Sequence, residues 1–140
     1  MFIRSERLFL RPVWPEDRLA FPCLADTASH GLRFPAFVIT VPGESGSEAI
    51  GLVALEPARD AARLRLWIAP GHRGRGFAGE ALGVVSDAAR SLGHACLLAD
   101  ADGPAAVRLA HKAGFREARS LAGASHVLDL ASDGDMPLAA

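Results

Sequence analysis

The segment Arg73-Gly74-Arg75-Gly76-Phe77-Ala78-Gly79 lies where the pattern of hydrophobic residues changes from one typical of strands to one typical of a helix. It follows an apolar run over Arg63–Ile68, and from Gly76 onward the hydrophobic positions repeat with a helical period. A strand that turns through glycines into a helix leaves backbone N–H groups free at the positive end of the helix dipole. Because glycine has no Cβ, a phosphate can approach such a backbone closely. The segment therefore predicts a binding site for a phosphorylated ligand.

Upstream of this turn the sequence predicts mainly strands. Leu8 and Leu10 alternate with Arg7, Phe9 and Arg11 and indicate a first strand, which Pro12 ends. Pro15 can then open a short helix that runs to about Ala25. The later apolar runs are separated by turn-rich residues at 42–46 and 59–60, and they predict strands over Phe34–Val41, Ala49–Glu56 and Arg63–Ile68.

Downstream of the turn, strands and helices alternate. A helix is expected from Gly76 to Gly93, with Glu80 as a solvated residue of its first turn, and a second helix from Pro104 to Gly114. The strands expected around these helices are Ala95–Ala99, Phe115–Ala118 and His126–Leu130. Hairpin strands followed by strand–helix–strand–helix–strand predict an α+β fold with a mixed sheet.

The length and composition of the chain predict one globular domain over residues 1–130, with a flexible tail over 131–140. Half of the 140 residues are hydrophobic and 22% are charged, which argues against disorder. A net charge of −1 predicts neither a nucleic-acid nor a membrane partner. No apolar run is long enough to cross a bilayer, and the N-terminus lacks the apolar core of a signal peptide. Cys23 and Cys96 have no metal-ligand spacing, so we expect buried thiols, no metal and a cytoplasmic location.

The glycine-rich turn can be compared with two phosphate-binding motifs, the P-loop and the dinucleotide-binding fingerprint. A P-loop is excluded, because it needs Lys followed by Ser or Thr where this chain has Glu80-Ala81. The G-x-G-x-x-G spacing of a dinucleotide fingerprint is met, and Asp100 ends the next strand, where a ribose-binding acid would belong. However, residues 69–73 separate the glycines from their strand, and only 40 residues follow Asp100. Dinucleotide binding stays an alternative.

Three segments resemble the GNAT superfamily of acyl-CoA N-acyltransferases. Arg73-x-x-Gly76-x-Ala78 is similar to the family signature R/Q-x-x-G-x-G/A. Ala106–Phe115 ends in Lys-Ala-Gly-Phe and resembles the family's second helix. Glu6-Arg7-Leu8-Phe9-Leu10-Arg11-Pro12 looks like the first strand of the branch that contains the ribosomal-protein N-terminal acetyltransferases. The three matches occur in the family's order and cover nearly the whole chain.

This resemblance implies acetyl-CoA as co-substrate, bound between two strands that splay apart. The strand before the turn would pair with the pantetheine arm through its main chain, and a main-chain amide near its end, at Ile68 or Ala69, would stabilise the oxyanion. Amides of the glycine turn would hold the pyrophosphate, and Gly103 opens the second helix where the branch often has Asn. The cofactor-binding residues expected on this basis are Trp67, Ile68, Ala69, Arg73, Gly74, Arg75, Gly76, Phe77, Ala78, Gly79 and Gly103.

The catalytic groups are not evident, because the chain departs from the family where many members carry hydroxyls. It has no tyrosine, and Ala110 and Ala106 occupy positions where relatives have Tyr and Ser. His111 is rotated about 100° around the helix from Ala110, so a surface histidine is the simpler interpretation. Asp100 and Asp102 are candidates for ordering a water that deprotonates the amine, and the alternative roles are a strand terminator for Asp100 and a turn or cap residue for Asp102.

The resemblance thus implies direct acetyl transfer from acetyl-CoA to a primary amine. A CoA-binding module that has lost turnover is the second hypothesis, since the usual donors are missing. The acceptor, whether a protein N-terminus, an amino acid, a polyamine or a drug-like amine, is left open, as is a homodimer. The segment from about Ala25 to Arg33, which helps build the acceptor pocket in the family, is short.

Overall fold

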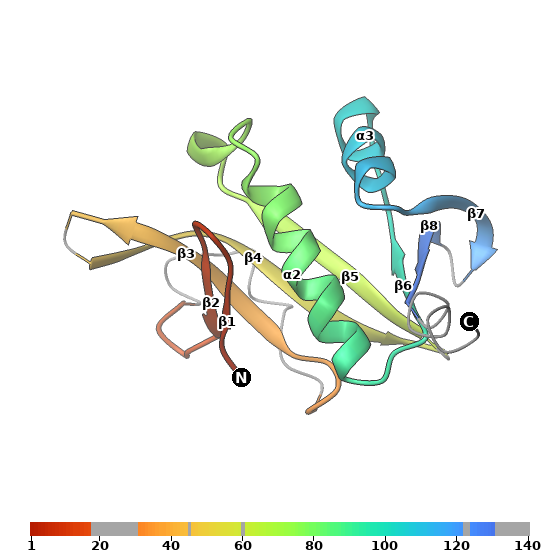
Figure 1. Ribbon diagram of the computed structural model, residues 1–140, viewed down its shortest axis with the longest axis horizontal. Coiled ribbons are helices and arrows are strands. Elements are labelled where there is room, and N and C mark those ends of the chain that lie inside the picture. The colour runs from red at the N-terminus through yellow and green to blue at the C-terminus, as the bar shows by residue number, and fades with distance from the viewer. Residues whose placement is uncertain (18–30, 45, 60, 122–123, 131–140) are drawn as a thin grey trace, which may run out of the picture.

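The computed structural model describes residues 1–17, 31–44, 46–59, 61–121 and 124–130, which form one mixed sheet with helices packed on it (Figure 1). Over these residues the sheet has eight strands in the order β1-β2-β3-β4-β5-β6-β8-β7. The strands are β1 Ile3–Arg4, β2 Phe9–Pro12, β3 Ala36–Gly43, β4 Gly46–Ala58, β5 Ala61–Ile68, β6 Cys96–Ala99, β7 Arg116–Leu121 and β8 Ala124–Asp129. The helices are α2 Phe77–Ser91, α3 Pro104–Lys112 and a 3-10 turn over Pro70–His72.

The strands β1 to β5 follow one another as an antiparallel meander. In the middle of it, residues 36–40 of β3 and 51–55 of β4 are buried on consecutive positions, so neither face of the sheet is open to water there. The helix α2 crosses one of these faces (Figure 1). The core is built where β3, β4, β5 and α2 meet, around Phe37, Ile39, Val53, Leu64 and Val85.

The helix α2 has the start and stop that its sequence predicts. Gly76 is its N-cap in a left-handed conformation, with φ of 82°, and Gly93 beyond its C-cap has φ of 89°. Its buried residues recur at helical spacing, and they are Ala81, Leu82, Val85, Ser86 and Ala89. The predicted helix is confirmed at both ends.

The expected α+β fold with a mixed sheet is confirmed. The hairpin of β3 and β4, the later strands and α3 lie where the sequence places them, and Phe115 folds back into the core after Gly114. The short strand β1, which forms a hairpin with β2, was not predicted. The helix expected over Pro15–Ala25, Cys23 and the tail over 131–140 fall largely or wholly outside the described residues.

One pair of strands among the described residues is parallel, namely β5 with β6. A dinucleotide-binding fold needs a largely parallel sheet with its fingerprint directly after a strand. The dinucleotide alternative is therefore wrong for this chain. In the described part of the chain no helix is long and apolar enough to cross a membrane.

Candidate active site between two splayed strands

The parallel pair β5 and β6 stays together for only two residues. Ala62 pairs with Leu97 and Arg63 with Leu98, and beyond these positions the two strands separate toward their C-terminal ends. Figure 1 shows this divergence, with α2 and α3 both beginning at its open end. A sheet interior with such a gap leaves main-chain groups of its strands without ladder partners.

The alternation of an antiparallel ladder decides which groups of β5 face this gap. The amide of Ala69 donates to the Ile50 carbonyl at 2.7 Å, so position 69 points toward β4. Trp67, two residues back, has the same orientation and pairs with Leu52. Leu66 and Ile68 consequently turn their main-chain groups toward the gap. The oxyanion contact was expected from the amide of Ile68 or of Ala69. Of these two amides, the one at Ile68 points toward the gap.

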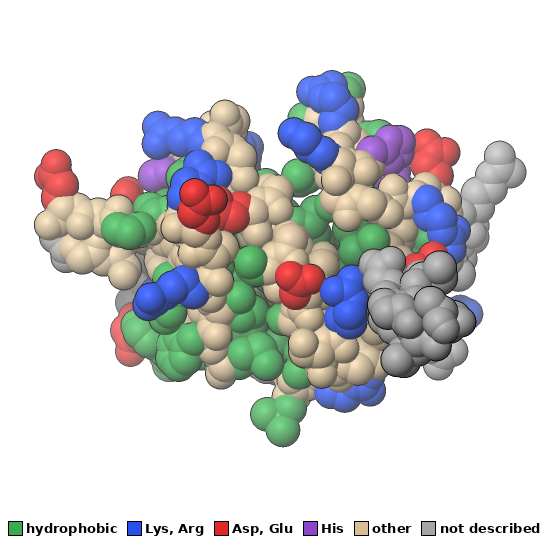
Figure 2. Space-filling view, in the orientation of Figure 1, with side chains coloured by type: hydrophobic (Ala, Val, Ile, Leu, Met, Phe, Trp, Pro, Cys, Tyr) green, Lys and Arg blue, Asp and Glu red, His purple; other side chains and the backbone are tan. Residues whose placement is uncertain are grey.

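A small apolar cavity of about 120 Å³ lies in the gap. Its walls come from β5, from α2 through Leu82, and from α3 through Ala106 and Ala110. Ala110 is 6% exposed, so the position where relatives carry tyrosine faces the space between the strands. Figure 2 shows the surface hollowed between α2 and α3, with hydrophobic side chains inside and basic side chains on both rims.

The glycine-rich turn forms one rim of the open end. Gly74 and Gly76 have φ of 79° and 82°, values that L side chains rarely adopt. The first helical hydrogen bond runs from the Glu80 amide to the Gly76 carbonyl at 3.1 Å. The amides of Phe77, Ala78 and Gly79 precede that bond and are directed out of the helix end. The side chains of Arg73 and Arg75 are exposed beside them.

Arg73 also fixes the end of β5. Its Nε donates to the carbonyl oxygen of Ile68 at 2.7 Å, across the short 3-10 turn. The residue that opens the signature thus ties the glycine turn to the strand whose amide faces the gap. A change at one end of this segment will displace the other.

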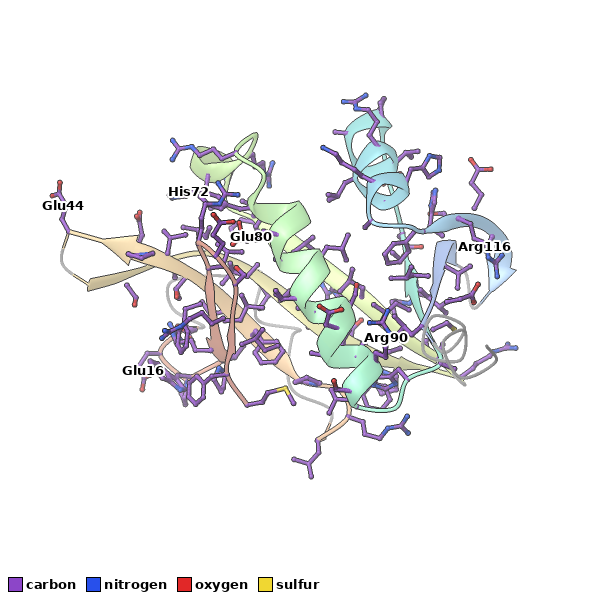
Figure 3. The ribbon with its side chains drawn as sticks, viewed as in Figure 1. Glu16, Glu44, His72, Glu80, Arg90 and Arg116 are labelled. Carbon is purple, nitrogen blue, oxygen red and sulfur yellow. The ribbon has the colours of Figure 1, made fainter. Side chains whose placement is uncertain are left out.

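A second contact anchors the turn from the N-terminal side. The Arg7 amide and its Nε each donate to the Glu80 carboxylate at 2.7 Å, and the Ser5 hydroxyl bonds to the same carboxylate. Arg7 Nη1 donates to the Arg75 carbonyl at 3.0 Å, and the guanidinium lies 4.5 Å from the centre of the Phe77 ring. Glu80 points from the first turn of α2 toward the N-terminal strands (Figure 3). The expectation of a solvated Glu80 is therefore wrong.

This contact also sets the charge of Glu80. Partial burial by itself would raise the pKa of the carboxyl group, but hydrogen bonds from Ser5 and Arg7 outweigh it and hold the pKa below its ordinary value of 4.5. Because the pKa of Glu80 is lower in the folded state than in the unfolded state, the ionised carboxylate stabilises the fold at pH values above the unfolded-state pKa. This stabilisation is lost as the pH falls through the folded-state pKa. Sequence analysis missed Arg7 and Ser5, although the match over Glu6–Pro12 contained Arg7.

The remaining candidate site residues lie next to β6 and in or next to α3. Asp100 ends β6, lines the cavity and pairs with Arg63 at 2.9 Å, although its side chain is 62% exposed. Asp102 is exposed, and Gly103 caps α3 with φ of 88°. His111 is exposed and lies against the ring of His126, away from the cavity that Ala110 lines. The structure places Ile68 and the glycine turn at the open end of the gap, whereas the main-chain groups of Trp67 and Ala69, which were also expected to bind the cofactor, face β4. Within the described ranges no titratable pair lies beside Ile68.

The family assignment follows from comparison with known proteins. The acetyltransferase (GNAT) domain family matches residues 16–116, well over half of the chain. No curated protein sequence matches. The chain belongs to the GNAT acetyltransferase family, whose reaction is the transfer of an acetyl group from acetyl-CoA to an amine.

Solved structures with the same fold cover almost the entire chain. A spermidine N-acetyltransferase from Vibrio cholerae, solved with CoA and spermine, has a TM-score of 0.71 and 20% identity over 91% of this chain and 98% of its own. An acetyltransferase from Agrobacterium tumefaciens has a TM-score of 0.64 and 23% identity, covering 91% and 92%. A proposed ribosomal-protein-serine acetyltransferase from Vibrio cholerae has a TM-score of 0.66 and 17% identity, covering 92% and 97%. At these identities the likeness establishes the fold.

Replacing Gly76 with valine is expected to weaken CoA binding at least tenfold, about 1.4 kcal/mol. A branched side chain would obstruct the phosphate, and its Cβ would lie 3.2 Å from Arg7 Nη2 at a φ of 82°. Calorimetric titration with CoA measures the effect, with Gly83→Val as the control, because a Cβ at that exposed helical position meets nothing within 4 Å. Unchanged affinity in a folded Gly76→Val protein removes the turn from the binding site.

Proposed function

We propose that the gap between β5 and β6 is the acetyl-CoA site of an amine N-acetyltransferase. The observation that carries the proposal is the early end of the parallel ladder, after Arg63 and Leu98, with an apolar cavity beyond it. The pantetheine arm would lie along Leu66 and Ile68, whose main-chain groups face the gap, and the Ile68 carbonyl would stay bonded to Arg73. The amides of the glycine turn would hold the pyrophosphate at the open end.

The chemistry that this arrangement supports is direct attack of a bound amine on the thioester. Holding the two reactants in line supplies most of the acceleration, since orientation alone can lower a barrier by about 7–11 kcal/mol. The Ile68 amide would donate to the oxygen that becomes negative in the tetrahedral intermediate. The attacking nitrogen, which is positively charged in that intermediate, loses a proton to water, the C–S bond breaks, and CoA leaves as a thiolate while the amide forms.

The acceptor, a primary amine, would approach from the opposite end of the gap. The spermidine acetyltransferase with a similar fold makes a polyamine one reasonable acceptor class to assay, beside peptide N-termini. An acetyl-CoA-dependent reaction and the free thiol of Cys96 favour the cytoplasm as the location. Burial raises the pKa of the Cys96 thiol, which keeps it in its less reactive protonated form.

Acetyl-CoA is expected to stabilise the folded chain. At a hundredfold excess over Kd, a ligand that binds only the native state adds about 2.7 kcal/mol, enough to raise Tm by several degrees. Thermal unfolding with acetyl-CoA, CoA and NAD measures this, with NAD as the control. A shift with NAD and none with acetyl-CoA contradicts the proposed site.

A CoA-binding module without turnover remains the second candidate, favoured by one observation. Ala106 and Ala110 line the cavity at positions where many members of the family carry hydroxyl groups, so neither of these two side chains can protonate the leaving thiolate. Thiol release from acetyl-CoA with a panel of amines distinguishes the two candidates. Thermal stabilisation by acetyl-CoA without thiol release from any amine identifies the module.

A further inference from the structure

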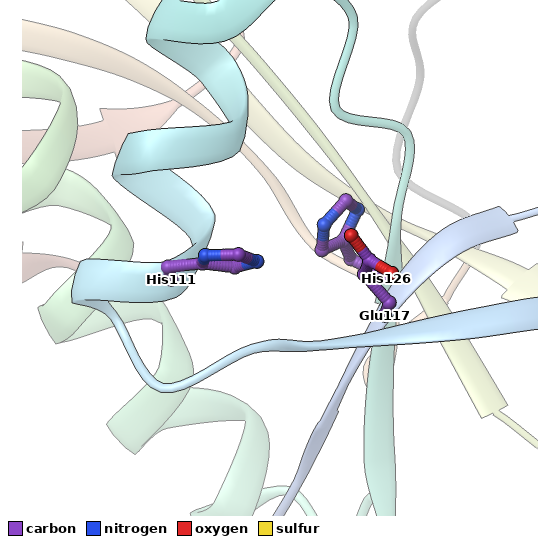
Figure 4. Close-up of side chains that lie close together, drawn as sticks. All are labelled: His111, Glu117 and His126. Carbon is purple, nitrogen blue, oxygen red and sulfur yellow. The ribbon is translucent and has the colours of Figure 1, made fainter.

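Three side chains with metal-binding atoms converge on the side of α3 that faces away from the cavity. His111 comes from the last turn of α3, Glu117 from β7 and His126 from β8 (Figure 4). One ring nitrogen of each histidine and one carboxylate oxygen of Glu117 all lie within 4.8 Å of one another. Glu117 and His126 are cross-strand partners, and the β7–β8 register becomes irregular directly after Glu117. The two residues are thus held side by side on the hairpin.

His126 carries the second, independent observation. It is only 4% exposed, and its Nε2 atom has no hydrogen-bond partner among the described residues. A buried polar atom without a hydrogen-bond partner destabilises the fold, so native proteins rarely keep one without a ligand or a role for it. Its neighbours in the cluster are a carboxylate and a second imidazole.

The contacts of the Ser125 hydroxyl are compatible with the tautomer of His126 that is protonated at Nδ1. The Ser125 hydroxyl accepts from the Ala101 amide at 2.9 Å, lies 2.8 Å from His126 Nδ1 and lies 3.4 Å from the Ala99 carbonyl. One hydroxyl has one proton and two lone pairs, so all three contacts are made only if it donates to Ala99 and Nδ1–H donates to it. In that arrangement Nδ1 carries the proton, and the buried Nε2 atom, which has no hydrogen-bond partner among the described residues, keeps its lone pair.

We propose that His111, Glu117 and His126 form a Zn²⁺ site. Two imidazoles and one carboxylate are a ligand set that zinc uses, with a fourth position left for water. Tetrahedral zinc with bonds of about 2.0–2.1 Å places its ligand atoms roughly 3.4 Å apart. Ligand atoms within 4.8 Å reach that spacing by rotation of the exposed His111 and Glu117 side chains around the fixed His126.

The surroundings of the cluster suit a metal ligand set. Metal-binding histidines commonly use their other ring nitrogen to bond a neighbouring group that fixes the ring, which is what Ser125 does for His126. A bound ion would join the end of α3 to the β7–β8 hairpin. The three ligands are spaced by six and nine residues and match no compact metal-binding motif, so this site could not be predicted from the sequence. The expectation of no metal rested on the cysteines alone.

Titration of the metal-free full-length chain with ZnCl₂ in a calorimeter tests the proposal. The wild type should take up one Zn²⁺ per chain and gain thermal stability, whereas MgCl₂ should do neither, because Mg²⁺ prefers oxygen ligands. His111→Ala and Glu117→Ala should each weaken Zn²⁺ at least tenfold. Both side chains are exposed, so these variants should fold, and neither change touches the acetyl-CoA cavity.

His72→Ala is the matched control. His72 lies 3.5 Å from Glu48, a second His–carboxylate contact that has no second imidazole beside it in the described ranges. Its Zn²⁺ affinity should equal that of the wild type. Absence of zinc uptake by the wild type, or equal binding in all four proteins, overturns the proposal. The readouts do not use acetyl-CoA, so this outcome is independent of the proposed transferase activity.

Discussion

Replacing Gly51 with valine should destabilise the chain by about 2–3 kcal/mol and lower Tm by roughly 10 °C. A Cβ at this position in β4 would lie 2.3 Å from the Trp67 carbonyl oxygen and 3.2 Å from the Ile68 Cα. Both atoms belong to the backbone of β5, so no side-chain rotation relieves the contact, and β5 must move.

The displacement should also reach the acetyl-CoA site, because Ile68 pairs directly with Gly51. We expect the remaining folded protein to bind CoA at least tenfold more weakly. Gly83→Val is the control, since a Cβ at that exposed position of α2 meets nothing within 4 Å and lies outside the segment from Ile68 to Gly79. Chemical unfolding and calorimetric titration of both variants measure the two effects. A Gly51→Val protein as stable as the control shows that β4 and β5 do not approach this closely.

The sequence predicted the fold because its local signals agree with one another. The glycines at 76, 93 and 114 mark helix ends, and the structure gives all three positive φ values. Alternating and continuous apolar runs located the long strands of the meander. Consistency between turn chemistry and hydrophobic period is what makes such a prediction succeed.

Contacts between distant segments could not be predicted in the same way. Ser5 and Arg7 meet Glu80 across more than 70 residues, and the sequence alone shows three ordinary polar residues there. The orientation of Ile68 toward the gap depends on one ladder bond, from Ala69 to Ile50. The cluster of His111, Glu117 and His126 exists only because α3 ends against the β7–β8 hairpin.

None of the described residues that line the cavity carries a hydroxyl group, and this gives the proposed reaction an expected pH dependence. An amine attacks only in its neutral form, so below its pKa the reactive fraction rises tenfold with each pH unit. That pKa is about 7.7–8.0 for an α-amino group and about 10.4 for a lysine-like amine. CoA leaves as a thiolate whose parent thiol has a pKa near 8.5, which makes it an adequate leaving group without an acid.

We therefore expect kcat/KM to rise by about tenfold per pH unit and then level off at the pKa of the acceptor. No alkaline limb should appear while the fold survives, because Ala110 and Ala106 offer no proton at the cavity. The measurement is kcat/KM against pH with two amines of different pKa, with unfolding monitored at each point. His111→Ala is the informative variant, since His111 faces away from Ala110 and the cavity. A bell-shaped profile whose alkaline limb disappears in His111→Ala would make His111 the general acid and contradict this mechanism.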